Sequence, residues 1–202
     1  MHALVEDNNI TKLINNPKSL VIGDVRYPAK IFSLWSKAEL NAIGIYEVET
    51  NSTNFKDEKW YNNTNESYAF GSGKVTRSWG TATAKAHADT LFTAQDETDG
   101  LGTEGDVKTR GLKYNLIQTL KSQVANELAN TDWYITRNTE KSTAIPSAIT
   151  THRDAVRTKQ ASMNTAITNA SDTSALETLY TYTEQEDGSV TRPLGELPTL
   201  ES

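Results

Sequence analysis

The sequence predicts an α+β fold: a small N-terminal β-rich domain with a short helix, followed by a C-terminal α-helical hairpin or bundle. Turn-forming Asn, Asp and Gly residues divide the first part of the chain into short apolar segments, and leucines then recur every four residues from Leu112 to Leu128. An acidic, glycine-rich stretch separates the two patterns. We therefore expect a β-rich domain at 1–95, a linker at 96–106, a helical hairpin domain at 107–182 and a hairpin or extended tail at 183–202.

Turn signals define the N-terminal strands. Asp7–Asn9 separates two apolar runs, and Gly23–Asp24 separates two more, which is typical of β-hairpins because Asn, Asp and Gly tolerate turn dihedrals. Large side chains alternate with small polar ones on both sides of Gly71–Gly73. This alternation predicts a further hairpin with one face covered.

One short helix is expected within the β-rich domain. Ser36 and Glu39 have the spacing of a capping box, in which each side chain satisfies an amide at the start of the helix. Gly44 suits the C-terminal cap, since it adopts a left-handed conformation without strain. Ile45–Val48 then returns to strand.

The apolar period changes in the second half of the chain. Its repeat predicts an amphipathic helix over about 107–129 that Asn130–Asp132 ends. The members of the repeat are Leu112, Leu116, Leu120, Val124 and Leu128. We expect Trp133–Ile135 to be a short extended piece, with the Trp133 indole folded back over Val124 and Leu128.

A narrower stripe follows Pro146, which suits a first helical position. The stripe predicts a second helix ending near Asn169, and its small apolar face requires packing against the leucine repeat. Its members are Ile149, His152, Val156, Met163 and Ile167. Ser174 and Glu177 offer a capping box for a short third helix, and Asp187–Gly188 marks a turn before the proline-containing end.

The composition is unusually polar for a folded chain. Only 36% of the 202 residues are apolar, whereas Thr and Asn contribute 28 and 16 residues. This predicts a thin core that is completed by a second copy or another protein, the alternative being a monomer with a polar, threonine-rich surface. A net charge of −6 without a basic patch disfavours nucleic acid as a partner, and no segment is apolar enough to span a membrane. The lack of cysteine excludes disulfides and thiolate metal sites.

No cofactor, metal or catalytic site is expected from the residue patterns. The segment 95–106 fits a calcium loop at Gly100 and at the last acid, Asp106, but Gln95 stands where the opening aspartate is required. His87 and Asp89 lack a third metal ligand. Gly71–Lys74 lacks the first glycine and the following Ser or Thr of a phosphate loop.

Two patches in the second half carry a family resemblance. Leu128–Trp133 reads LANTDW, and Ile145–Pro146 is followed by HRDAVR at His152–Arg157. This order resembles the C-terminal region of tailed-bacteriophage tail proteins, which include tail-fibre-associated and tail assembly chaperone-like families. His152 and Val156 replace the usual aromatic residue and leucine. The stretch from Phe32 to Val48 and the extreme N-terminus are similar to the start of such virion proteins.

The resemblance implies a non-enzymatic structural component of a phage tail, namely a baseplate or tail-fibre adaptor. The alternative is a tail or tail-fibre assembly chaperone that is not retained in the virion. Either role implies other tail proteins as partners and a homo-oligomer, made in the host cytoplasm, with a host receptor possible but not indicated.

We expect the contacts to involve the leucine repeat and the residues of the two resembling patches, among which Arg153 and Arg157 share a helix face. The sequence leaves two alternatives for these arginines. One of them forms an ion pair with Asp132, or both lie on a solvated face. The candidate interaction residues are Leu112, Leu116, Leu120, Val124, Leu128, Asp132, Trp133, Arg153, Val156 and Arg157.

Overall fold

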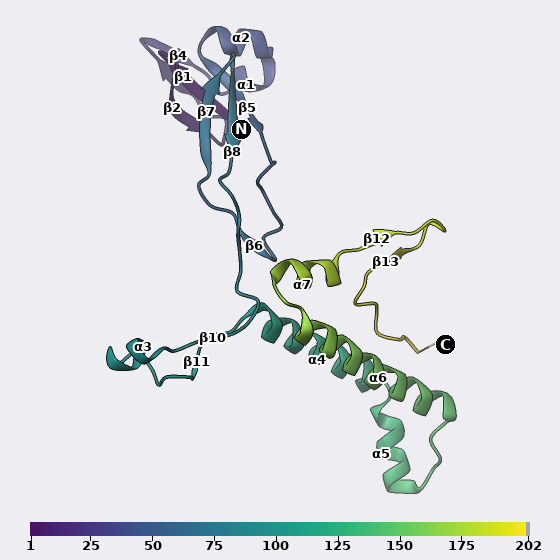
Figure 1. Ribbon diagram of the computed structural model, residues 1–202. Helices are drawn as coiled ribbons and strands as arrows, with labels where there is room; N and C mark the ends of the chain where they lie inside the picture. The colour runs from purple at the N-terminus through teal and green to yellow at the C-terminus, as the bar shows by residue number, and fades with distance from the viewer. Residues whose placement is uncertain (201–202) are drawn as a thin grey trace. The chain divides into compact units, whose positions relative to one another are not determined.

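The computed structural model describes residues 1–200 and divides into two compact units, Met1–Thr83 and Ala84–Ser202 (Figure 1). The first unit is rich in β-structure and the second is mainly helical, which confirms the predicted α+β class. The division follows Thr83, whereas the sequence placed it near residue 100, because the backbone of Lys85, Ala86 and His87 is hydrogen-bonded to the starts of α4 (Leu112–Ala129) and α7 (Thr173–Tyr180).

A five-stranded sheet forms the centre of the first unit. Its order is β2-β1-β5-β8-β7, and only the β5–β8 pair is parallel. The strands are β1 (His2–Glu6), β2 (Asn9–Ile14), β5 (Ile45–Thr50), β7 (Ser67–Gly71) and β8 (Lys74–Ser78). β6 (Tyr61–Asn62) pairs separately with β9 (Thr83–Ala84).

Short elements cover the sheet and complete its core. They are the hairpin of β3 (Leu20–Ile22) and β4 (Val25–Tyr27), and the helices α1 (Ile31–Leu34) and α2 (Lys37–Ala42). The main core cluster consists of Leu4, Ile14, Leu20, Ile31, Leu40 and Ile45. A smaller cluster of Ala3, Val5 and Val75 lies beside it. The core is therefore built from isolated aliphatic side chains of many short elements.

The predicted turns of this unit are confirmed. Asp7 and Asn8 both adopt positive φ angles in the β1–β2 turn, as do Ser72 and Gly73 between β7 and β8. The capping box at the start of α2 is also present. Gly44 has a φ of +80°, and a Cβ there would lie 2.6 Å from the Val5 carbonyl oxygen, so both dihedral and space require glycine.

The predicted acidic linker is instead a folded arm, residues 89–110, which we call the acidic arm. β10 (Thr90–Leu91) pairs with β11 (Val107–Thr109), and α3 (Ala94–Thr98) lies between them. The Asp89 carboxylate closes the base, where it pairs with Arg110 at 2.6 Å. Gly100 and Gly105 have positive φ angles within the arm, so these glycines serve its turns and do not separate domains.

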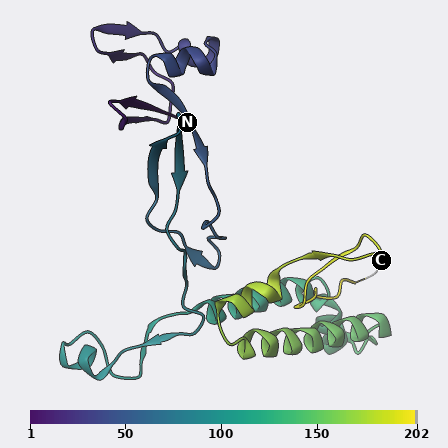
Figure 2. The ribbon, with the colours of Figure 1, turned by 45° about the horizontal axis from the view of Figure 1, so that its top comes forward.

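Four helices make up the rest of the second unit. They are α4 (Leu112–Ala129), α5 (Asp132–Lys141), α6 (Ser147–Asn169) and α7 (Thr173–Tyr180). α4 and α6 pack side by side, as predicted (Figures 1 and 2). α4 begins five residues later than the predicted 107, because Val107–Thr109 pairs with β10.

Three local predictions of secondary structure in this unit are wrong. Pro146, expected at the first helical position, is instead the N-cap of α6, which begins at Ser147. Trp133–Ile135 lies in the first turn of α5 and is not extended. α7 is capped by Asp172, whose carboxylate accepts a hydrogen bond from the Ala175 amide, and not by Ser174. Asp172 also has the extended backbone that an N-cap requires.

The C-terminal segment returns to the helices. β12 (Thr183–Glu184) and β13 (Val190–Thr191) form the predicted hairpin, with a φ of +80° at Gly188. Leu194 is buried, and its amide donates to the Leu179 carbonyl. The tail predicted for 183–202 is thus a hairpin followed by an anchored segment, and its residues 201 and 202 lie outside the described residues.

Candidate interaction surface

The α4–α6 contact is the apolar framework of the second unit. Leu116, Leu120 and Val124 are buried on α4, whereas Leu112 and Leu128 at its ends are only partly buried. The buried apolar residues of α6 are Ile149, Val156, Met163 and Ile167. The predicted stripes therefore face into the unit, and most of these side chains stabilise the hairpin instead of offering a surface.

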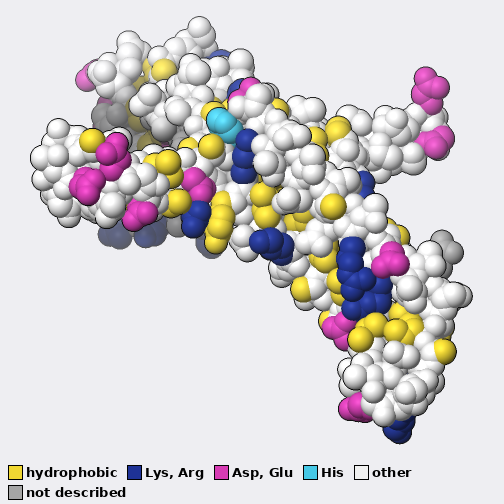
Figure 3. Space-filling model, turned by 60° about the horizontal axis from the view of Figure 1, so that its bottom comes forward, with side chains coloured by type: hydrophobic (Ala, Val, Ile, Leu, Met, Phe, Trp, Pro, Cys, Tyr) yellow, Lys and Arg dark blue, Asp and Glu magenta, His cyan; other side chains and the backbone are white. Residues whose placement is uncertain are grey.

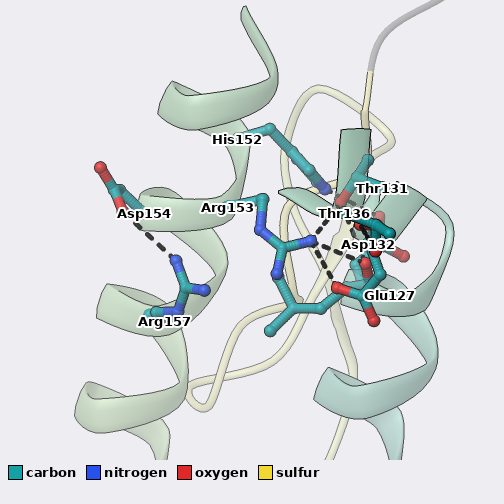
Figure 4. Close-up of polar contacts among 9 residues, drawn as sticks. Glu127, Thr131, Asp132, Thr136, His152, Arg153, Asp154 and Arg157 are labelled. Carbon is teal, nitrogen blue, oxygen red and sulfur yellow. Dashed lines mark hydrogen bonds and ion pairs between the residues drawn. The ribbon is translucent and has the colours of Figure 1, made fainter. Parts of the chain in front are cut away.

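A buried arginine joins the two patches that carry the sequence resemblance. Arg153 of α6 donates from Nη1 to the Leu128 carbonyl at 2.9 Å and to the Thr131 hydroxyl at 2.7 Å (Figure 4). The same atom lies 2.8 Å from the Asp132 carboxylate. We call Arg153 and these three partners the Arg153 cluster. It places a cation at the C-terminal end of α4, where unpaired carbonyls and the helix dipole favour positive charge.

The Arg153 cluster explains why α5 begins at Asp132. The Asp132 carboxylate lies in the first turn of α5, where the helix dipole favours negative charge, and the Arg153 guanidinium holds it there. Thr131 is buried between the two helices, and its hydroxyl also donates to the Leu128 carbonyl. The ion pair between Asp132 and an arginine, left open by the sequence, is thus formed by Arg153.

His152 and Arg157 have different surroundings. The His152 side chain is buried, with Nε2 3.1 Å from a Glu127 carboxylate oxygen of α4. Arg157 is exposed and, within residues 1–200, forms its one ion pair with Asp154 of its own helix, at 3.4 Å (Figure 4). Arg157 therefore takes no part in the junction of α4 and α5.

Contrary to the prediction from the sequence, Trp133 does not fold back over the end of α4. Its indole is 51% exposed and stacks on Tyr134, with a ring-centroid distance of 3.8 Å. The Arg137 guanidinium lies over both rings, 4.7 Å from the Trp133 centroid and 5.4 Å from that of Tyr134. The helix directs Trp133 outward because Asp132, its neighbour, is the residue that faces Arg153.

α5 has no buried residue along its ten-residue length. Besides Trp133, Ile135 is 40% exposed. Short helices in water depend on the burial of an apolar face, and α5 has its aromatic and aliphatic side chains at the surface. We call Trp133, Tyr134 and Arg137 the α5 face. Ile135, two residues after Trp133, lies on the other side of the helix. Arg137 was not among the residues predicted from the sequence, although its position one turn after Trp133 is the signal for such stacking.

The acidic arm offers a second exposed surface at the other end of α4. Leu91, Leu101 and Val107 are exposed on it, next to five acidic residues between Asp96 and Asp106. Figure 3 shows acidic side chains gathered over α3. A hydrogen bond from Lys108 and others from Thr93 lower the pKa of Asp96 to about 2. The Asp96 carboxylate therefore links α3 to β11 within the arm.

Asp89, considered as a metal ligand, has structural partners. It accepts hydrogen bonds from the Gly111 amide and from Arg110, and these contacts hold its pKa below the ordinary value. Within residues 1–200 no three His, Asp or Glu side chains converge in the manner of a metal site. Among the helices described, none is both long and apolar enough to cross a bilayer.

Comparison with known proteins adds no relative. Neither the family models nor the curated proteins nor the solved structures include a match to this chain. The features of this chain that bear on function are the α5 face, the acidic arm and the two resembling patches joined by Arg153.

Proposed function

We propose that this protein is a non-enzymatic structural component of a bacteriophage tail, a baseplate or tail-fibre adaptor that acts through protein–protein contacts. The observation that carries the proposal is α5, a helix with no buried residue and with Trp133 and Ile135 largely exposed. Tryptophan, tyrosine and arginine are the residue types that dominate binding energy at protein interfaces, and α5 presents all three together.

The Arg153 cluster supports a presenting role for α5. It fixes the helix at its first residue through a buried cation, so the exposed side chains project from a defined position. Preorganisation of this kind lowers the entropic cost of association. The same cluster unites the two sequence patches that resemble phage tail proteins, which is why we assign the contacts to a tail.

The test is mass spectrometry of purified particles of the phage that encodes the chain. A structural component is expected at a fixed copy number relative to other tail proteins. If the chain is made during infection but is missing from the particles, the adaptor role is wrong and the assembly chaperone role replaces it.

Substitutions then connect the role to the α5 face. Phage carrying Trp133→Ala are expected to incorporate less of the chain, because the largest exposed apolar side chain of α5 is lost. Leu34→Ala provides a matched control, since Leu34 is also exposed but lies in the first unit. Equal incorporation of the two variants would remove α5 from the proposal.

A further inference from the structure

We infer that the α5 face of one copy binds the acidic arm of a second copy, so that the chain associates head to tail. This inference rests on the proposed function, because it names the partner of the same exposed helix. It commits to one occupant, the segment around Leu101, Glu104 and Asp106 of another copy of this chain.

Arg137 indicates that the occupant of the α5 face is anionic. Its guanidinium is stacked on two aromatic rings, yet no residue within 1–200 forms an ion pair with it. The Nε atom is buried and lacks a hydrogen-bond partner among the described residues. A stacked guanidinium retains its in-plane donors, which match the geometry of a carboxylate. Glu140 and Lys141, one turn later, cancel each other's charge.

The acidic arm has the complementary features. Leu101, three residues after the end of α3, is 61% exposed and offers an aliphatic group for the Trp133 indole. The Glu104 and Asp106 side chains are exposed, and no ion pair or hydrogen bond engages their carboxylates within the described chain. The arm thus combines an apolar tip with two available carboxylates, whereas Asp96 is already paired with Lys108.

The positions of the two surfaces exclude pairing within one copy. The arm precedes α4 and α5 follows it (Figure 1). At 1.5 Å per residue, the 18 residues of α4 separate the two by about 27 Å. A contact between two different surfaces of identical chains generates a reciprocal two-fold dimer, a larger closed ring or an open filament. All three are arrangements in which a thin-cored subunit gains burial from its neighbours.

The experiment is light scattering and sedimentation of the purified full chain over a concentration series. The parent is expected to associate reversibly, with mass rising with concentration. Arg137→Glu and the double variant Glu104→Arg/Asp106→Arg should each weaken association about tenfold or more, because each places like charges opposite one another. Lys121→Glu on α4 and Glu186→Arg in the β12–β13 turn are controls that should associate like the parent.

Mixing the two defective proteins gives the decisive result. Each has one intact surface, and the reversed charges on α5 and on the arm attract, so the mixture should form mixed oligomers that neither protein forms alone. Circular dichroism establishes that each variant is folded before mixing. Mixed oligomers support head-to-tail pairing, whereas a mixture that stays as unassociated as its components overturns it.

Two other outcomes also overturn the inference. One is a parent chain that remains monomeric at every concentration, and the other is association that Arg137→Glu and the arm variant leave unchanged. These outcomes are distinguishable from failure of the proposed function. A monomeric chain found at fixed copy number in particles refutes self-pairing alone, and a self-pairing chain missing from particles refutes the adaptor role alone.

Discussion

Replacement of Arg153 by methionine tests whether the Arg153 cluster positions α5. Methionine keeps an aliphatic side chain of similar length in the buried site, so the change removes the charge and the donors without a large cavity. Two hydrogen bonds from the guanidinium, to the Leu128 carbonyl and the Thr131 hydroxyl, are lost together with the ion pair to Asp132.

The expected loss of unfolding free energy depends on which partners the Leu128 carbonyl and the Asp132 carboxylate keep in the variant. The Leu128 carbonyl keeps its hydrogen bonds from the Thr131 amide and hydroxyl, so it is not left unpaired. The Asp132 side chain is 60% exposed and regains water, which reduces the contribution of the ion pair. Hydrogen bonds to a charged group contribute about 1.5–3 kcal/mol each, but their replacement by a well-packed apolar group offsets part of this, so we expect a loss of about 2 kcal/mol.

The assay combines urea unfolding, followed by far-ultraviolet circular dichroism, with amide hydrogen exchange. Arg153→Met should lower the free energy of unfolding of the helical unit and speed exchange in α5 more than in α4. Arg157→Met is the matched control, four residues along the same helix, where the exposed pair with Asp154 should contribute no more than about 0.5 kcal/mol. If the two variants are equally stable and α5 exchanges alike in both, the Arg153 cluster does not hold α5.

Two further predictions concern packing and pH. Leu120→Ala should lower the unfolding free energy by about 2–5 kcal/mol because Leu120 is buried between α4 and α6. Leu128→Ala should lower it less because Leu128 is partly exposed. Similar losses for the two variants in urea unfolding would contradict this packing. The folded-state pKa of Asp96 lies near 2, below its ordinary 3.8, so its ionised form stabilises the acidic arm above about pH 4, and that contribution disappears as the pH falls toward 2. Amide exchange or chemical shifts of α3 measured against pH should report this loss, and Asp96→Asn should abolish the dependence.

Turns and long helices were predictable because their causes are local. Asp7, Asn8 and Gly23 tolerate positive φ angles that other residues avoid, so the turns follow from residue type alone. The four-residue repeat from Leu112 to Leu128 specifies which face of α4 packs, and tertiary packing changed only where the helix begins.

The candidate surface was only partly predictable. Asp132, Trp133 and Arg153 could be singled out from their patches, but Trp133 was assigned to the wrong environment. Its exposure depends on Arg153, which is distant in sequence and binds the preceding Asp132. Arg137 was missed, because its stacking matters only once Trp133–Ile135 is helical and faces outward.

By itself, the sequence determined the α+β class, the hairpin turns and the two long helices, since each depends on neighbours within a few residues. Tertiary structure decided that residues 89–110 fold as an arm, that α5 exists, and that Leu194 is buried against α7. These features depend on strand pairing and on a buried guanidinium that join segments far apart in the chain. These contacts contribute to stability only when the distant segments pack together, so a pattern of neighbouring residues cannot predict them.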